Sequence, residues 1–346
     1  MTQQYKHTPE IPPQAILLDH LLGMMKTQAI HVAVQINLAD LLKDGSRSAA
    51  ELAAATGTKE AALSRLLRTL ASLGIFEEVE PGYFAQTPLS HLLRPGVPGS
   101  MYDIAYIHGE RWQWRPWEEF LYSLQTGNTA FDLLFGENLF DYFAKHSQDN
   151  ERFHKAMAGF SNQVNHPLAQ GYDFSSIRTL VDVGGGYGGL LTTILRTYTN
   201  VRGVLFDLPH VIAEAEKHIA STGVADRCRL VGGDIFNTED LPQKADAYIM
   251  KQIIKDWDDE RAIRILSHCR QAMQTDGRVL VAEQVLLPGR QTVAAKLIDL
   301  QLMVVSSGQE RDEAQYRRLF EAAGLELVKI WPTHSPYSIL EGIAAA

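Results

Sequence analysis

Residues 182–189 read Asp182-Val183-Gly184-Gly185-Gly186-Tyr187-Gly188-Gly189, and a helix-like segment begins at once with Leu190 and Leu191. The residues just before the glycines, 178–183, form a short β-branched run that is typical of a strand. Glycines at such a junction let the backbone turn sharply and approach a ligand closely. The segment therefore predicts a strand, a tight ligand-binding loop and a helix.

The same alternation continues toward the C-terminus. Short strand-like runs and helical stretches follow one another, which favours a doubly wound parallel sheet with ligands at the carboxyl ends of its strands. We expect strands at residues 178–183, 202–206, 227–231, 245–251 and 277–283, and helices at 189–198, 211–222 and 259–273. The predicted fold class is α/β with a Rossmann-like sheet.

The first hundred residues have the periodicity of helices instead. One apolar helical face is formed by Leu17, Leu18, Leu21, Leu22 and Met25. Ser48-Ala49-Ala50-Glu51 has the pattern of a capping box, so a short helix should begin there and end at Gly57. A third helix is expected at 61–73, and Pro81-Gly82 separates two short strand-like runs. Three helices and a hairpin predict a winged helix.

A winged helix is compatible with binding DNA, but the charges do not favour it. The helix that would enter a groove offers as cations only Lys59, Arg65 and Arg68. The predicted wing carries the acidic residues Glu77, Glu78 and Glu80. The whole chain has a formal net charge of −9, which opposes general affinity for phosphates. We therefore favour a scaffold or dimerisation role over nucleic acid binding, with a DNA-binding regulator as a distant alternative.

Composition indicates the class of protein and its compartment. With 346 residues and 45% hydrophobic composition, the chain can form two domains or one large domain with an extension. Cys228 and Cys269 are its only cysteines, so no disulfide framework is implied. Residues 1–14 lack the order of a signal peptide, and charges interrupt the apolar stretch 15–42. We expect a cytoplasmic protein with no membrane partner and no metal.

Residues 101–170 should be helical and are unusually aromatic. Most of these rings are expected to pack in a helical core, while a few line a pocket for a flat, apolar ligand. The expected organisation is a winged-helix domain at 1–100, a helical region contributing to the substrate pocket at 101–170, and the ligand-binding α/β domain at 171–346.

The glycine loop alone leaves the cofactor class open. Gly184, Gly186 and Gly189 also have the spacing of a dinucleotide-binding loop, and Asp207 ends the second predicted strand, where a ribose-binding acid would lie. A nicotinamide-dependent oxidoreductase is therefore an alternative.

Three further residues favour a different cofactor. Asp182 precedes the glycines by two positions, where its carboxylate can meet a cationic group, and a dinucleotide fingerprint does not require it. Asp234 follows the third predicted strand beside apolar residues that suit an adenine ring, and Lys251 ends the fourth.

Six segments together resemble the S-adenosylmethionine-dependent O-methyltransferases of the plant caffeate/flavonoid, hydroxyindole and bacterial antibiotic type. They are residues 181–188, 206–211, 232–236, 250–251, 256–257 and 308–311, and the resemblance covers nearly the whole chain. It implies a class I methyltransferase domain with an N-terminal winged-helix dimerisation domain, a homodimer and a small-molecule substrate.

The resemblance also implies a site for S-adenosylmethionine, with S-adenosylhomocysteine as the product. The glycine loop would curve around the methionyl part of the cofactor, while Asp207 would bind the ribose and Asp234 the adenine amino group. The residues expected to bind the cofactor are Asp182, Gly184, Gly186, Asp207, Asp234, Phe236 and Lys251.

At the catalytic position the chain departs from the family. Relatives use the histidine of a His-Asp-Trp motif as general base, whereas this chain has Lys255-Asp256-Trp257. Glu283 and Glu310 match the two acids that flank that histidine in the family. Because lysine has an ordinary pKa of about 10.4, Lys255 should be a cationic donor that holds a substrate oxygen or polarises a carbonyl.

Two reactions remain open. In the first, the enzyme methylates a hydroxyl of an aromatic or polyketide-like metabolite, and Glu283, Glu310, His108 or a water removes the proton. In the second, the protein is a pericyclase or cyclase that binds the same cofactor, and Lys255 with His108 donates hydrogen bonds to a substrate carbonyl. The resemblance places four residues at the substrate, namely Trp117, Phe153, Met157 and Asp256.

Overall fold

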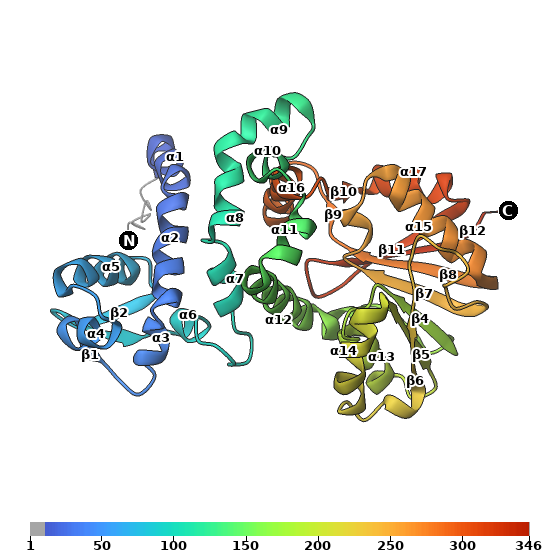
Figure 1. Cartoon of the computed structure of the whole chain (residues 1–346), viewed down its shortest axis with the longest axis horizontal. Coiled ribbons are helices and arrows are strands. Elements are labelled where there is room, and N and C mark those ends of the chain that lie inside the picture. The colour runs from blue at the N-terminus through green and yellow to red at the C-terminus, as the bar shows by residue number, and fades with distance from the viewer. Residues whose placement is uncertain (1–10, 346) are drawn as a thin grey trace, which may run out of the picture. The chain divides into compact units, whose positions relative to one another are not determined.

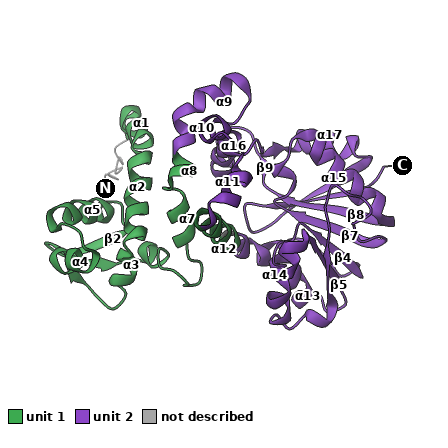
Figure 2. Ribbon diagram, in the orientation of Figure 1, with its two compact units in different colours: residues 1–114, 148–159 green, residues 115–147, 160–346 purple. Residues whose placement is uncertain are grey.

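The computed structural model describes residues 11–345, which divide into two compact units (Figure 2). Unit 1 combines the chain up to residue 114 with residues 148–159, and unit 2 combines residues 115–147 with the chain from residue 160. One helix, α12 (Ser147–Gly171), supplies residues to both units. The sequence-based division at 100 and 170 stays a prediction.

Unit 1 contains helices around a small antiparallel sheet of order β1-β3-β2. In chain order its elements before α12 are α1 (Pro13–Leu21), α2 (Gly23–Gln35), α3 (Leu38–Leu41), β1 (Arg47–Ser48), α4 (Ala49–Thr56), α5 (Glu60–Ser72), β2 (Phe76–Glu80), β3 (Tyr83–Gln86), α6 (Pro88–His91), α7 (Tyr102–Ile107) and α8 (Arg111–Trp114). The predicted helices and hairpin are confirmed, and the order of elements is that of a winged helix.

Local chemistry explains where α4 and α5 begin and end. Ser48 Oγ accepts the Glu51 N–H at 3.2 Å, and Glu51 Oε2 accepts the Ser48 N–H at 2.8 Å, so the predicted capping box is present. Gly57 ends α4 with a φ of +67°. On α5, Leu63, Leu67 and Leu70 are buried in the core of unit 1.

The apolar face predicted on the first helix is not covered by any other part of residues 11–345. None of the described residues of α1 is buried, and the side chains of Leu17 and Leu21 are 61% and 69% exposed. Met24 and Met25 continue this exposed apolar surface onto α2. Isolated exposed leucines are common, but a contiguous apolar face marks an interaction surface.

Unit 2 begins with short helices that carry many of the aromatic residues. They are η1 (Arg115–Glu119), α9 (Phe120–Thr126), α10 (Ala130–Phe135) and α11 (Leu139–Lys145). Phe131 is fully buried, stacks on Phe135 with ring centroids 4.4 Å apart, and meets Tyr142 edge-on at 5.5 Å. These rings pack in a helical core, as expected for most aromatic residues of this region.

The main element of unit 2 is a seven-stranded sheet of order β11-β12-β8-β7-β4-β5-β6 (Figure 1). Its strands are β4 (Thr179–Val183), β5 (Arg202–Asp207), β6 (Cys228–Gly232), β7 (Ala245–Lys251), β8 (Met273–Glu283), β11 (Leu325–Pro332) and β12 (Ser338–Ala344). The five predicted strands are confirmed and run parallel, whereas β11 and β12 were not expected and β12 is antiparallel to both neighbours.

Helices cover both faces of this sheet. The predicted helices appear as α13 (Gly189–Thr197), α14 (Pro209–Ala220) and α15 (Asp259–Ala272), followed by α16 (Val293–Val305) and α17 (Glu313–Ala322). Alternate residues of each strand face opposite layers, so Leu205 packs with α13 and α14 while Phe206 packs with α15 and α17. No helix within residues 11–345 is long and apolar enough to cross a membrane.

The strand order reverses at β4, which pairs with β5 on one side and β7 on the other. In doubly wound sheets, ligands bind at the carboxyl ends of the strands at such a reversal. The glycine loop leaves β4 at this edge, and Lys251 ends β7 beside it. The topology therefore places the candidate site here.

A buried carboxylate ties the antiparallel strands to the rest of the sheet. Glu341 on β12 accepts hydrogen bonds from Tyr172 Oη at 2.9 Å, Arg278 Nη1 at 2.6 Å and Trp331 Nε1 at 2.8 Å. Arg278 lies on β8 and Trp331 on β11, so one side chain joins three neighbouring strands. Burial raises the pKa of the Tyr172 hydroxyl to about 12, which keeps it a donor.

We expect Glu341→Ala to lower the free energy of unfolding by about 2–4 kcal/mol, because it removes the acceptor of three donors. Urea denaturation followed by far-UV circular dichroism measures the change. Glu326→Ala is the matched control, since Glu326 is exposed on β11. Equal loss in the two variants would show that the Glu341 network adds nothing to stability.

Candidate functional site

The glycine loop has a conformation that other residues adopt only with strain. Gly184, Gly186 and Gly188 have φ angles of +65°, +58° and +80°. A Cβ on Gly188 would lie 2.8 Å from a methyl carbon of Ile219, so the loop also packs closely on the helix layer. The loop amide of Gly184 donates to the Phe206 carbonyl at 2.8 Å.

Asp207, at the end of β5, holds the loop from the neighbouring strand. Its Oδ2 accepts the N–H of Gly186 at 2.8 Å, and its Oδ1 accepts the N–H of Leu208 at 2.7 Å. Each oxygen keeps a further lone pair, which suits the hydroxyl groups of a ribose. The structure thus brings together Asp207 and the glycine loop, as the sequence predicts.

Asp182 and Lys251 form a buried pair of charges below the loop. Asp182 Oδ2 has no hydrogen-bond partner among the described residues. Burial raises the pKa of Asp182 to about 7, opposed by the charge of Lys251. Burial likewise lowers the pKa of Lys251 to about 8, opposed by Asp182, and Lys251 donates to the side chains of Ser161 and Asn165 on α12. A buried carboxylate oxygen without a donor fits a ligand that brings a cationic group.

Asp234 and Phe236 lie in the turn after β6. The turn is joined to Asp207, whose carbonyl accepts the Gly233 N–H at 3.0 Å. Asp234 is exposed, and its Oδ1 accepts the Phe236 N–H at 2.9 Å. The ring of Phe236 meets Trp257 edge-on with centroids 4.9 Å apart. All residues predicted to bind the cofactor therefore lie along one edge of the sheet. They provide adjacent oxygen acceptors, one of which is a buried carboxylate oxygen without a partner among the described residues, and these groups fit the hydroxyls and the cationic groups of S-adenosylmethionine.

Lys255 lies in the turn η3 (Ile254–Asp256) that follows β7. Its side chain is 13% exposed, and Nζ pairs with Asp256 Oδ1 at 3.0 Å. Burial acts to lower the pKa of Lys255, but the carboxyl groups of Asp256, Glu283 and Glu310 together outweigh burial and raise it. The ammonium therefore keeps its proton at neutral pH and is a hydrogen-bond donor.

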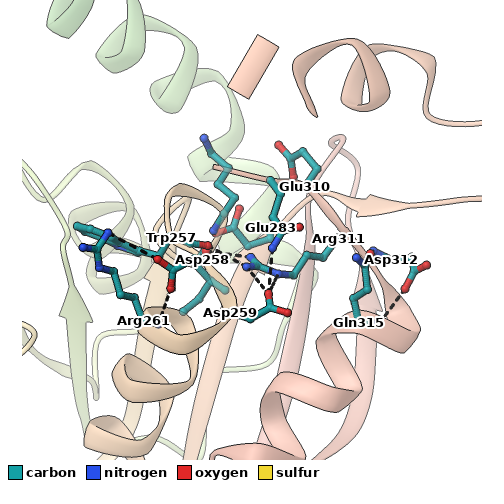
Figure 3. A network of polar contacts seen from close by, with 12 residues as sticks. Trp257, Asp258, Asp259, Arg261, Glu283, Glu310, Arg311, Asp312 and Gln315 are labelled. Atoms are coloured by element: carbon teal, nitrogen blue, oxygen red, sulfur yellow. Dashed lines mark hydrogen bonds and ion pairs between the residues drawn. The ribbon is translucent and has the colours of Figure 1, made fainter. Parts of the chain in front are cut away.

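A short parallel pairing of strands brings Glu283 and Glu310 into this region, and Figure 3 labels the two acids. Glu283 ends β8, and Glu310 directly precedes β10 (Arg311–Asp312). β10 pairs with β9 (Val285–Leu286), with Arg311 opposite Val285. Because each acid lies one or two residues before this pairing, the ladder fixes their relative positions.

Both acids have a raised affinity for protons. Burial raises the pKa of Glu283 to about 8 and that of Glu310 to about 7, while Lys255 opposes both shifts. Glu283 Oε1 accepts the Lys255 backbone N–H at 3.3 Å, whereas both oxygens of Glu310 are without a hydrogen-bond partner within residues 11–345. Near neutral pH both of these carboxyls can therefore gain or lose a proton.

The residues predicted to contact substrate are divided between the two units. In unit 2, Trp117 on η1 donates from Nε1 to Gln301 Oε1 of α16 at 2.6 Å. In unit 1, His108 Nδ1 lies 2.8 Å from the Ile104 carbonyl oxygen, and Phe153 meets Trp112 edge-on at 6.0 Å. Met157, also in unit 1, is half-buried on α12. The role of His108, Phe153 and Met157 at the site of Lys255 stays a prediction.

The structure adds residues that the sequence did not indicate. Asp299 on α16 accepts the Glu310 backbone N–H at 2.8 Å, although it is 11 residues away in the chain. Gln252, between Lys251 and the Lys255 turn, has a φ of +59°, and its side chain donates to the Tyr337 hydroxyl. Neither residue type nor spacing signals these roles. Arg311 belongs to the segment 308–311 that carries the family resemblance, but its contacts could not be predicted from the sequence.

Known proteins that resemble this chain are methyltransferases, and several of them are bacterial. The chain is 45% identical to the phenazine O-methyltransferase PhzM of Lysobacter antibioticus over 331 residues, which is 96% of each protein. The match to the crystal structure of LaPhzM covers 96% of this chain and 100% of the LaPhzM chain, with a TM-score of 0.88 and 44% identity. CalO1, a methyltransferase in calicheamicin biosynthesis solved with S-adenosylhomocysteine bound, has a TM-score of 0.86 at 34% identity and covers 97% of the chain and 100% of its own.

Other relatives are named as O-methyltransferases or as N-methyltransferases. Two family profiles match in succession: the O-methyltransferase dimerisation domain over residues 18–95 and the O-methyltransferase domain over residues 117–326. These matches decide against a nicotinamide-dependent oxidoreductase. The chain belongs to the S-adenosylmethionine-dependent O-methyltransferase family.

Proposed function

We propose that this enzyme transfers a methyl group from S-adenosylmethionine to a hydroxyl of a small aromatic or polyketide-like metabolite. The observation that carries the proposal is the pairing of a cationic donor, Lys255, with a buried acid, Glu310, whose pKa is raised to about 7 and whose two oxygens have no partner among the described residues. A donor and a proton acceptor of this kind together suit a hydroxyl substrate.

The cofactor would be held by the residues at the carboxyl edge of the sheet. Asp207 has free lone pairs for the ribose, Asp234 is exposed toward solvent for the adenine amino group, and Asp182 Oδ2 offers a buried acceptor. Gly184, Gly186, Lys251 and Phe236 complete the set. When bound, S-adenosylmethionine supplies an electrophilic methyl group on a sulfonium centre.

Lys255 and Glu310 divide the work that one histidine does in relatives. An aromatic hydroxyl has a pKa of about 10, so it must lose its proton as it reacts. Lys255 would donate a hydrogen bond to the oxygen and stabilise the developing negative charge. Glu310 would accept the proton, because an acceptor with a pKa near 7 is well matched to neutral pH. Glu283, with one oxygen already accepting the Lys255 N–H, is the second acceptor.

The lysine also favours oxygen over nitrogen as the methylated atom. A hydroxyl oxygen has two lone pairs, so it can accept a hydrogen bond from Lys255 and still present a lone pair for methylation. An aromatic ring nitrogen has a single lone pair, which the ammonium would occupy. The proposal therefore selects hydroxyl acceptors, although some relatives are named as N-methyltransferases. Trp117 and Asp256 would contact the substrate from unit 2.

We expect label from methyl-deuterated S-adenosylmethionine to appear as a methyl ether when the enzyme is incubated with a metabolite extract of its source organism. Mass spectrometry of the products measures this. Labelled N-methyl products would contradict the hydroxyl assignment. If substrate were converted while the cofactor stayed intact, this result would contradict methyl transfer and support the pericyclase or cyclase reaction.

The rate should depend on the ionisation of Glu310. Its carboxylate accepts a proton only above its pKa of about 7, so kcat/KM should rise from about pH 6 to pH 8 and fall as the pH is lowered. We expect Glu310→Gln to remove the rise centred near pH 7, so that any remaining rise follows the pKa of Glu283 at about 8, and to lower kcat by about 10²- to 10⁴-fold. Glu313→Gln, which changes an exposed glutamate on α17, is the matched control. An unchanged pH profile in Glu310→Gln would exclude this acid as the acceptor.

We also propose that the protein is a homodimer formed through unit 1. The exposed apolar face of α1 and α2 lies within the region that matches the dimerisation domain. Its large exposed side chains are Ile16, Leu17, Leu18, Leu21, Met24 and Met25. If a second copy of the chain covered this surface, burial would stabilise the dimer by about 25 cal/mol for each Å² of apolar surface removed from water. The cytoplasmic location expected from the sequence stays a prediction.

The double variant Leu17→Glu/Leu21→Glu should shift the mass in solution to that of the monomer, 38.6 kDa, because the two charges would have to be buried in the dimer. Size-exclusion chromatography with light scattering measures the mass. Asp44→Lys, in the exposed loop after α3, is the control and should stay dimeric. A double variant that remains dimeric would move the interface elsewhere.

A further inference from the structure

Arg311 is the most completely enclosed cation near the site. Its side chain is 0% exposed, and its guanidinium makes four hydrogen bonds (Figure 3). Nε and Nη2 donate to Asp259 Oδ1 at 3.0 and 2.8 Å, Nη1 donates to the Ile254 carbonyl at 3.0 Å, and Nη2 donates to the Trp257 carbonyl at 2.8 Å. All of these acceptors belong to the loop 254–259, which contains Lys255.

The two carbonyls stand on either side of Lys255 and Asp256 in the chain, so Arg311 fixes both ends of the Lys255 turn. A second set of contacts holds its middle. The Gln309 N–H donates to the Lys255 carbonyl at 2.7 Å, and Gln309 Nε2 donates to Asp259 Oδ1 at 2.9 Å. We call this arrangement of residues 308–311 on the loop 254–259 the arginine clamp.

Gly308 shows how closely the two segments approach. A Cβ on Gly308 would lie 2.6 Å from the Lys255 carbonyl oxygen and 3.3 Å from the Cα of Asp256. Contacts of that kind with backbone atoms cannot be relieved by moving a side chain. The clamp therefore leaves Lys255 little freedom to move relative to residues 308–311.

Arg311 is also connected to both acids through the backbone. Arg311 follows Glu310 directly and is paired with Val285, two residues after Glu283. Arg311 thus holds the segment that carries the donor through its guanidinium, and it is connected to the segments that carry the acceptors through its backbone. Asp259, the counter-ion, has a side chain that is 64% exposed, so the pair is buried on one side only.

We propose that Arg311 is a positioning residue: by clamping the loop 254–259 onto residues 308–311, it sets the distance and orientation between Lys255 and Glu310. This inference rests on the methyl transfer proposed above. A buried guanidinium has a desolvation cost that an apolar side chain would avoid, so what arginine adds is four hydrogen bonds in fixed directions. Arg311 touches neither reacting group through its own side chain.

The first test compares Arg311→Lys with Arg311→Gln. Lysine keeps the positive charge but cannot reproduce the planar fork, so kcat should fall about 10- to 100-fold through misplacement, with the pH profile in its original position. Glutamine also removes the charge, which in the wild type acts to lower the pKa of Glu310 against the larger effect of burial. The acid limb of kcat/KM should therefore move to higher pH in Arg311→Gln alone.

Two measurements separate positioning from general stability. The dissociation constant for S-adenosylmethionine, from calorimetry, should stay within about twofold of the wild type, because the cofactor residues lie outside the clamp. Amide hydrogen exchange should increase at residues 254–259 and at Gln309 in both variants. Arg317→Gln changes an exposed arginine paired with Glu313 on α17, and it should leave kcat and exchange in the loop unchanged.

Two milder variants cover the case in which the Arg311 variants do not fold. Gly308→Ala presses on the Lys255 carbonyl and should lower kcat, whereas Asp259→Asn keeps the acceptor oxygen and should cost only a few-fold. The clamp would be refuted by unchanged kcat in the folded variants, or by unchanged exchange at 254–259. Absence of labelled ether from the wild type would instead contradict the proposed reaction, and the exchange measurement would still test the clamp.

Discussion

The parallel pairing of β4 with β7 is the constraint on which the rest of the site depends. It is the point where strand order reverses, so the loops that follow these two strands diverge to opposite sides and leave room for a ligand between them. The glycine loop leaves β4, and the Lys255 turn leaves β7. Asp182 and Lys251 lie at this junction as a buried, imperfectly compensated pair of charges. A single ladder thereby positions both the residues proposed to bind the cofactor and the lysine proposed to act in catalysis.

Charge in the interior is arranged in two different ways. Arg311 donates four hydrogen bonds, two of them to Asp259, which suits a structural role. Lys255 faces Glu283 and Glu310, whose unpaired oxygens and raised pKa values leave their protonation open to change. In the reaction proposed above, Lys255 keeps its proton and donates a hydrogen bond, while a carboxylate accepts the proton of the substrate.

How much of this follows from sequence depends on the range of the interaction. The capping box at Ser48 and the turn at Gly57 are local, and the strand at 245–251 contains the apolar run 247–250, so these elements can be predicted from the sequence. The ladder of β9 and β10 has two residues on each strand, too few for any periodicity, and β12 pairs with residues about 60 positions earlier. Contacts made by Asp299 and Arg311 likewise depend on tertiary packing. The identity of the candidate residues could be read from motifs, whereas their hydrogen bonds and raised pKa values could not.

The position of β12 has a consequence for the growing chain on the ribosome. β12 lies between β8 and β11, although it emerges after both of them. Until residues 338–344 have been synthesised, β8 presents an unpaired edge next to the site, and Tyr172, Arg278 and Trp331 lack the carboxylate of Glu341. In this state the nascent chain exposes an edge that other strands can pair with, and the sheet is complete only after β12 has been synthesised. Deleting residues 338–344 would remove a strand from the interior of the sheet and break the pairing on both of its sides. Deleting an edge strand would leave the pairing of the other strands intact.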